Sequence, residues 1–301
     1  MPRPSTERRG TEPTLVTSEI LRAWPLPDPA GGKNVRGSIL VIGGSAETLG
    51  AVVLAAEAAL RAGAGKLQVA TVASMAPYAA QSLPEARVLG LPETSGGALG
   101  PDAADAVRDL AESADAVIIG PGMADTEATQ AFGERLFPHL SGPLALDALG
   151  LASVTADEKC LHHLDGRVVL TPNPTEMAIS LHVEDDEVDD DPAGAALELA
   201  RRARGAVVLG GVTSWIATPD ADLWRDDSGG AGLGVSGSGD VQAGIVGGLL
   251  ARGAEPAQAA VWATYLHGRA GERLASSVGR LGFLARELAP EIPRALAEVT
   301  S

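Results

Sequence analysis

The segment best suited to chemistry is Gly237-Ser238-Gly239-Asp240, which stands just before an apolar stretch. The two glycines leave the backbone uncrowded, so the N–H groups of Gly237, Ser238 and Gly239 can surround an anion. A helix expected over residues 241–252 adds the positive end of its dipole. Asp240 is then placed to take a proton from a hydroxyl that attacks a phosphoryl group. The alternatives are a flexible loop, or an Asp240 that only caps the helix.

Oxygen ligands are also concentrated in "TPNPTE", where Asn173 and Glu176 stand three residues apart. This pair can hold a hydrated Mg²⁺ and its phosphates, directly or through water. A capping arrangement at the start of a helix near Glu176 explains the same residues equally well. Asp147 follows another apolar run and is either a buried structural carboxylate or a substrate contact. Both questions stay open on the sequence alone.

Other reactive residue types give little support for metal or nucleophilic chemistry. The five histidines have no ligand-like spacing, so a zinc site or a Ser-His-Asp arrangement is disfavoured. We expect His267 to be a helical packing or capping residue, with a place near a nucleotide as the alternative. Seven of the eight residues in "EDDEVDDD" (184–191) are acidic. Such a block predicts a solvated loop, because it lacks the ligand spacing of a calcium loop.

Short apolar runs alternate with Ala- and Leu-rich amphipathic runs along the chain. The apolar runs do not alternate with polar residues, which is typical of parallel strands buried on both faces. Amphipathic helices are predicted over 51–61 and 241–252, each ending next to a glycine. The strands are predicted at 38–42, 67–72, 116–119, 143–146, 168–170 and 206–209, with an edge hairpin formed by 215–218 and 223–225.

The candidate residues follow the predicted strands. Small and polar segments come directly after five of them: "GGSAETLGA", "GPGMAD", "DALG", "TPNPTE" and "GGVTS". Ligands of open parallel sheets bind outside the carboxyl ends of the strands. The sequence therefore predicts that these segments and the turn at 237–240 meet at one rim of a mainly parallel, helix-covered sheet.

Composition limits the partners. The chain has 301 residues and a formal net charge of −16, so neither a nucleic acid nor an anionic membrane is an expected partner. Cys160 is its one cysteine, and the polar N-terminus has no apolar core of a signal peptide, which together favour the cytoplasm. We expect a disordered tail over 1–14 and a single α/β domain over 15–301.

Six segments occur in the order typical of one family. They are "KNVRGSILVIGGSAETLGAVVLAAEAALRAGAGKLQVAT", "IIGPG", "LALDALGL", "VVLTPNPTE", "GSGDVQAGIVGGLLARG" and "YLHGRAGERLA". In these segments the chain resembles the ADP- or ATP-dependent NAD(P)H-hydrate dehydratases over about residues 15–275. The resemblance implies a ribokinase-like fold, a three-layer α/β sandwich with a mainly parallel central sheet. It also implies a homo-oligomer.

The resemblance further implies a reaction. The family repairs hydrated NADH and NADPH: ADP or ATP, with Mg²⁺, phosphorylates the ring hydroxyl, and phosphate then leaves. Asp240 would be the base, with Glu176 near the metal through water. Matching positions imply substrate contacts at Ala51, Gly122, Asp147, Asn173 and Asp240. The implied nucleotide and phosphate contacts are Gly210, Gly211, Ser214, Gly237, Ser238 and Gly239.

Three positions depart from the family pattern. Asn173 stands where the family usually has His, and Gly210-Gly211 stands where it usually has Lys-Gly. Leu149 replaces the second Asp of the usual Asp-Ala-Asp. Asn173 and Glu176 also resemble the Asn-x-x-Glu motif of ribokinase-like kinases. Two alternatives to the dehydratase are therefore a kinase of a small hydroxylated metabolite and a non-catalytic nucleotide-binding paralogue.

Overall fold

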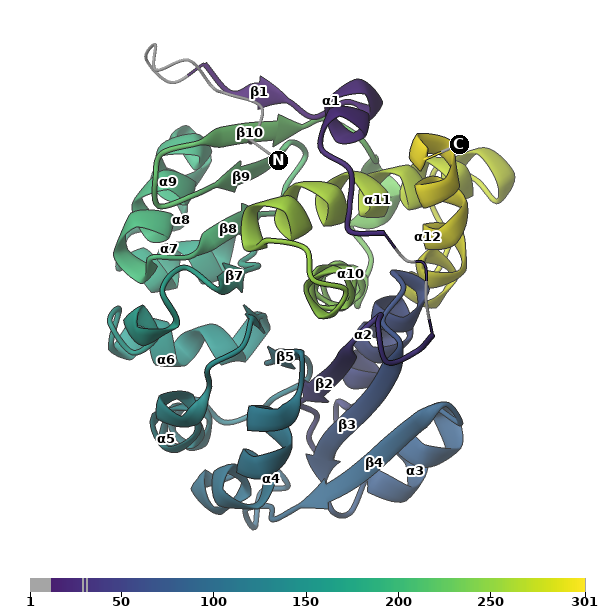
Figure 1. The fold of residues 1–301 in the computed structure, drawn as a ribbon. Coiled ribbons are helices and arrows are strands. Elements are labelled where there is room, and N and C mark those ends of the chain that lie inside the picture. The colour runs from purple at the N-terminus through teal and green to yellow at the C-terminus, as the bar shows by residue number, and fades with distance from the viewer. Residues whose placement is uncertain (1–11, 29, 31, 301) are drawn as a thin grey trace.

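A ten-stranded sheet runs through the molecule (Figure 1). The computed structural model describes residues 12–28, 30 and 32–300. The strand order is β1-β10-β9-β8-β7-β6-β5-β2-β3-β4, and the pairs from β8 to β4 are all parallel. The strands are β1 Thr14–Leu15, β2 Ser38–Ile42, β3 Lys66–Val72, β4 Ala86–Leu91, β5 Ala116–Ile119, β6 Leu144–Leu146, β7 Val168–Leu170, β8 Ala206–Leu209, β9 Ser214–Ala217 and β10 Leu223–Asp226.

Helices cover both faces of the sheet, which confirms the three-layer sandwich. Ile39 and Val41 of β2 point into a core shared with α1, α2, α10, α11 and α12, whereas Leu40 and Ile42 point into a core shared with α4 to α9. In the described chain, no helix combines the length and apolarity needed to cross a bilayer. The helices are α1 Ser18–Ala23, α2 Leu49–Arg61, α3 Ala76–Ser82, α4 Pro101–Ser113, α5 Thr126–Leu136, α6 Ala152–Ala156, α7 Pro174–Leu181, α8 Asp185–Asp190, α9 Pro192–Ala203, α10 Ser238–Ala251, α11 Pro256–Ser277 and α12 Ala285–Thr300, with short 3-10 helices η1 Phe137–His139, η2 Ala148–Leu151, η3 His162–Leu164 and η4 Ala231–Leu233.

The predicted buried strands are confirmed, and the errors lie at the ends of the sheet. β4 was not predicted, because Arg87 and Gly90 interrupt its apolar pattern and it is only partly buried. The hairpin of β9 and β10 was predicted at the edge, but β1 pairs with β10 and forms the edge itself. Of the expected disordered tail, residues 1–11 lie outside the described residues, and Thr14 belongs to β1.

The acidic segment 184–191 was predicted to be a solvated loop, and this prediction is wrong. Residues Asp185–Asp190 form α8, whose first turn is closed by a capping box between Glu184 and Glu187. Acidic residues at the start of a helix interact favourably with its dipole, which offsets part of their mutual repulsion. Val188 points into the core and is 1% exposed, so one apolar side chain anchors the segment.

The α10 helix packs unusually closely on its neighbours, and glycines make this possible. A Cβ atom on Gly244 would lie 2.3 Å from the carbonyl oxygen of Ala55 in α2, and one on Gly248 would lie 2.4 Å from that of Ala59. On another side of α10, a Cβ on Gly247 would lie 2.4 Å from Ile118 of β5. These contacts fix the axis of α10 against both α2 and the sheet. The direction in which its first turn points is therefore set by packing along its whole length.

We predict that Gly244→Ala lowers the free energy of unfolding by about 1–3 kcal/mol, because the added methyl group meets backbone rather than a movable side chain. Gly50→Ala is the matched control, since it also lies in a helix but has no atom within 4 Å of its Cβ position. This control should be neutral or slightly stabilising. Urea unfolding of both variants measures the difference, and equal stabilities would contradict the close packing.

Candidate active site

The sequence-predicted residues do meet at one rim of the sheet, beyond the carboxyl ends of β2, β5, β6, β7 and β8. The α10 helix begins at this rim, with Gly237 as its N-cap and Asp240 at its third position. Asp240 is therefore not the N-cap, and the segment is an ordered helix start rather than a flexible loop. The Asp240 carboxylate is half-buried and accepts no hydrogen bond from the described residues. A carboxylate left free at a helix N-terminus is available to a ligand.

The turn before α10 keeps three backbone amides free. Gly237 has a φ of 89°, which favours glycine, and a Cβ there would lie 2.5 Å from Leu54. Within the part of the chain described, the N–H groups of Gly237, Gly239 and Asp240 donate no hydrogen bond. The amide of Ser238 was expected among the donors, but it donates to the Val235 carbonyl at 3.1 Å. The amides left free to bind an anion are therefore those of Gly237, Gly239 and Asp240, without that of Ser238.

Three carboxylates share the rim. Burial raises the pKa of Asp147 to about 8, and repulsion by Asp240 and Glu176 adds to this. Burial, followed by repulsion from Glu176, raises the pKa of Asp240 to about 6. Burial also raises the pKa of Glu176. No Lys or Arg of the described chain is near enough to oppose these shifts. The rim therefore carries concentrated negative charge that a cation would stabilise.

Asp147 and Asp240 differ in accessibility. Asp147 is 5% exposed and accepts a hydrogen bond from the Thr171 hydroxyl, with 2.6 Å between Oγ1 and Oδ1. With a pKa near 8 it is mostly protonated at neutral pH. Thr171 was not singled out from the sequence; its position at the end of β7, beside the end of β6, is the signal that points to it. Asp240 has the lower pKa and the freer position, so it is the better base.

Asn173 and Glu176 form the capping arrangement that the sequence offered as an alternative to a metal site. The Glu176 amide donates to Asn173 Oδ1 at 2.9 Å, and the Asn173 amide donates to Glu176 Oε2 at 2.9 Å. Together they close the first turn of α7. Glu176 keeps one carboxylate oxygen outside this pair, so capping and a water-mediated contact with a metal are compatible.

The expected substrate contacts Ala51 and Gly122 lie side by side. A Cβ on Gly122 would be 3.0 Å from that of Ala51, and the φ of Gly122 is 66°. The contact is held by a hydrogen-bonded chain that the sequence did not reveal: Thr48 Oγ1 donates to the Gly122 carbonyl at 2.6 Å, and Ser45 lies 2.6 Å from the same Thr48 oxygen. The loops after β2 and β5 are thereby fastened together.

The expected nucleotide contacts after β8 also reach the rim. The Gly210 amide donates to the Pro172 carbonyl at 3.3 Å, which places this loop beside "TPNP". A Cβ on Gly210 would have Gln242 of α10 as its nearest neighbour, at 4.0 Å. Gly211 follows in the same loop, and Ser214 is the first residue of β9. There is consequently space for a side chain at Gly210, where the family pattern has Lys.

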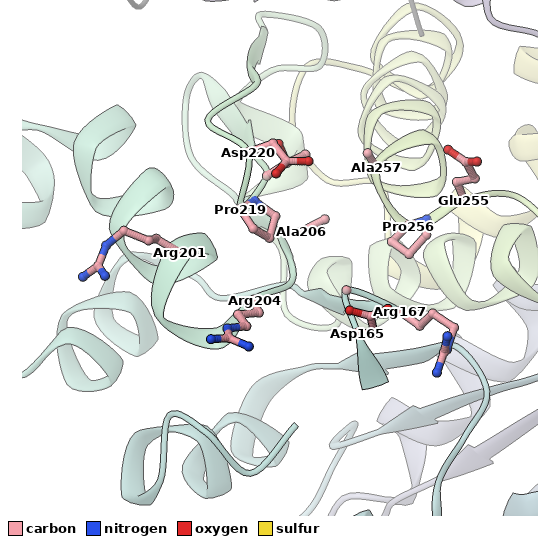
Figure 2. Close-up of a pocket in the computed structure, with 12 residues that line it drawn as sticks. Asp165, Arg167, Arg201, Arg204, Ala206, Pro219, Asp220, Glu255, Pro256 and Ala257 are labelled. Carbon is pink, nitrogen blue, oxygen red and sulfur yellow. The ribbon is translucent and has the colours of Figure 1, made fainter. Parts of the chain in front are cut away.

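A cavity of about 580 Å³ lies at the amino ends of the strands, and Figure 2 shows the residues that line it. Asp165, Arg167 and Ala206 stand at the amino ends of β7 and β8, so the cavity is separated from Asp240 by the length of these strands. Arg201 is ion-paired with Glu198 at 2.8 Å, and both Asp220 and Glu255 also line the wall. It contains none of the residues predicted to bind substrate or nucleotide.

The described residues hold no group of three or more His, Cys, Asp or Glu side chains arranged to bind a metal ion. A resident metal held by the protein alone therefore does not fit this rim. A divalent cation brought in by nucleotide phosphates does fit, because the carboxylates lack a basic neighbour. Glu176 would face such an ion through water.

A mainly parallel sheet covered by helices on both faces, with a glycine turn at the start of α10, agrees with a ribokinase-like α/β fold. The family whose sequence model is described as NAD(P)H-hydrate dehydratase matches residues 39–294. The chain belongs to this family.

Individual relatives agree with this assignment. The ADP-dependent (S)-NAD(P)H-hydrate dehydratase of Xanthomonas campestris pv. campestris is 45% identical, covering 94% of this chain and 96% of its own. The bifunctional NAD(P)H-hydrate repair enzyme Nnr of Moorella thermoacetica is 35% identical over 94% of this chain, which spans 53% of that longer protein. The structure of the ADP/ATP-dependent NAD(P)H-hydrate dehydratase from Bacillus subtilis, co-crystallised with ATP/Mg²⁺, superposes with a TM-score of 0.81 at 29% identity, covering 96% of this chain and all of the other.

The buried Asp147 should make folding stability depend on pH. Its pKa is about 8 in the folded protein and about 3.9 in an unfolded chain, so the folded state binds the extra proton between these values. Stability from this group is then lost as the pH rises from 4 to 8. We predict that the free energy of unfolding of Asp147→Asn, relative to that of the wild type, rises by about 2–5 kcal/mol between pH 4 and pH 8. Urea unfolding at both pH values tests this, and a gap that does not change with pH would contradict it.

Proposed function

We propose that this chain dehydrates hydrated NADH and NADPH at the expense of ADP or ATP, with Asp240 as the general base. The proposal rests on one observation above the others: the free Asp240 carboxylate stands beside three unpaired amides at the start of α10. The amides bind a phosphoryl group, and the carboxylate accepts the proton of the group that attacks it. Membership of the dehydratase family supplies the substrate that carries this hydroxyl.

The reaction needs both steps because hydroxide is a poor leaving group. Asp240 takes the proton of the ring hydroxyl as the hydroxyl oxygen attacks the terminal phosphorus of the nucleotide. The bond from that phosphorus to the bridging oxygen breaks. The nucleotide leaves one phosphate shorter, as AMP from ADP. The lone pair of the ring nitrogen then expels the new phosphate as the carbon–oxygen bond of the substrate breaks. The iminium ring that results loses a proton from the adjacent carbon to solvent, which restores the carbon–carbon double bond. NADH or NADPH and inorganic phosphate are the products.

The other groups at the rim act through electrostatic interactions with the phosphates. The amides of Gly237, Gly239 and Asp240 and the dipole of α10 stabilise the transferring phosphoryl. A nucleotide-bound Mg²⁺ would supply positive charge to the phosphates and reduce repulsion between them and the rim carboxylates. Glu176 would orient this ion through water. Since Gly210 provides no ammonium group, phosphate binding relies on amides and the ion more than in relatives with Lys there.

The substrate side is formed by the fastened loops after β2 and β5. Ala51 and Gly122 leave a surface without bulky side chains, which suits the flat face of a nicotinamide ring. Asn173 stands exposed at the start of α7 and can bond the ring substituents in place of the family's His. Asp147, mostly protonated, can donate to a substrate oxygen. A homo-oligomer and a cytoplasmic location remain predictions from the sequence.

Replacing Asp240 by Asn should lower kcat by about 10²–10⁴-fold, because proton transfer is lost while the shape is kept. ADP affinity should be unchanged or tighter, since a negative charge beside the phosphates is removed. The wild-type rate should fall about tenfold per pH unit below pH 6, where the base becomes protonated. The return of dihydronicotinamide absorbance from hydrated NADPH and ADP measures all three.

The control for Asp240→Asn is Asp186→Asn, which removes an exposed carboxylate of α8. Asp186 is not among the residues of the candidate site, so this variant should leave the rate unchanged. An Asp240→Asn enzyme that keeps near-wild-type rates would show that the carboxylate only stabilises α10, through its interaction with the helix dipole. Folded wild-type protein that never restores the absorbance would rule out the dehydratase function itself.

A further inference from the structure

The α11 helix lies along the loop that leads into the anion-binding turn. A Cβ on Gly268 would be 1.9 Å from the hydroxyl of Ser228, and one on Gly271 would be 2.7 Å from Leu233. These residues are three apart and share one face of the helix. The absence of side chains on that face lets Ser228 and Leu233 approach the α11 backbone. The path of the chain into the turn is therefore set by α11 (Figure 1).

His267 is on the same stretch of α11 and touches the turn itself. Its Nε2 atom lies 2.9 Å from the Ser238 hydroxyl, and the two residues are 9% and 5% exposed. Burial lowers the pKa of His267 to about 4, so the imidazole is neutral at physiological pH. A neutral imidazole offers one donor and one acceptor, and a hydroxyl can match either. The contact is thus a buried hydrogen bond between uncharged partners.

Ser238 is the anchored residue between two glycines. Its amide donates to the Val235 carbonyl and its hydroxyl pairs with His267, so both of its polar ends are engaged. Gly237 has the left-handed φ of 89°, and the Cβ position of Gly239 has no atom within 4 Å. Glycine can adopt a wider range of backbone angles than other residues, so a fixed residue between two glycines limits how they orient. The direction of the neighbouring amides consequently depends on Ser238.

We propose that His267 is a positioning residue for the nucleotide phosphates. Through Ser238 it fixes the first turn of α10, so that the amides of Gly239 and Asp240 and the Asp240 carboxylate converge on one point. His267 touches neither nucleotide nor substrate, and Ser238 contributes its hydroxyl to this anchor rather than to the phosphates. The proposal rests on the proposed function, because it takes the turn to be the phosphate site.

The test is a double-mutant cycle read out by ADP binding without substrate, using isothermal titration calorimetry. His267→Phe keeps a ring of similar size but no hydrogen bond, and Ser238→Ala removes the partner. We expect each single variant to bind ADP about tenfold more weakly, which is the effect of one buried hydrogen bond. The double variant should bind within about twofold of Ser238→Ala, because His267 acts only through that hydroxyl.

Two further variants separate positioning from packing. His267→Gln places an amide near the original Nε2 and should recover ADP affinity to within about threefold of wild type. His162→Phe is the matched control, since His162 is a half-buried histidine that also bonds through Nε2, to the Arg202 carbonyl at 2.8 Å. It should leave ADP affinity unchanged. Thermal unfolding of every variant identifies those that fail to fold, and the cycle then relies on Ser238→Ala and His267→Gln.

Three outcomes would overturn the proposal: wild-type ADP affinity in His267→Phe, additive losses in the double variant, or no recovery with Gln in a folded protein. The dehydratase function is judged separately, by the restored absorbance. A wild type that binds ADP but does not dehydrate leaves the positioning intact and removes the function. A wild type that binds no nucleotide removes both.

Discussion

The close packing of α10 is the constraint on which the site depends. Gly244 and Gly248 bring it against the backbone of α2, Gly247 brings it against β5, and His267 of α11 holds its first turn. A helix N-terminus is an anion site only if its amides point at the ligand and stay unpaired. Here the packing of three neighbouring elements determines that direction. The glycines of "GSGDVQAGIVGG" therefore have two purposes: those at the start free the amides, and those further along set the axis.

Negative charge at the rim is the second determinant of function. Burial and mutual repulsion separate the pKa values of two carboxylates, to about 8 for Asp147 and about 6 for Asp240, so that one is mostly an acid and the other mostly a base at neutral pH. The same charge repels bare phosphates, and none of the described Lys or Arg side chains compensates for it at the rim. The site is consequently suited to a nucleotide that carries a divalent cation, and in the proposed function the neutral amides bind the phosphoryl group.

Strand exits and motif order made most of this site predictable from the sequence. Buried strands such as Ala116–Ile119 are continuous apolar runs, and their ends locate the rim, whereas β4 was missed because its outer face is partly solvated and its pattern is mixed. Long-range partners were beyond local patterns. Ser238 looks like a phosphate ligand until His267, 29 residues away, is seen to hold it. Likewise the pair Asn173 and Glu176 fits a metal or a cap equally well until the backbone shows the cap.

In the proposed reaction the oxygen of the substrate hydroxyl becomes an oxygen of the released phosphate. The most direct measurement uses hydrated NADPH that carries ¹⁸O in the ring hydroxyl, with unlabelled ADP and water, and analyses the phosphate by mass spectrometry. Phosphorylation followed by carbon–oxygen cleavage predicts one ¹⁸O atom in each phosphate formed and none in the solvent. Unlabelled phosphate, with the ¹⁸O recovered in water, would contradict the account, because the hydroxyl would then have left without ever being phosphorylated.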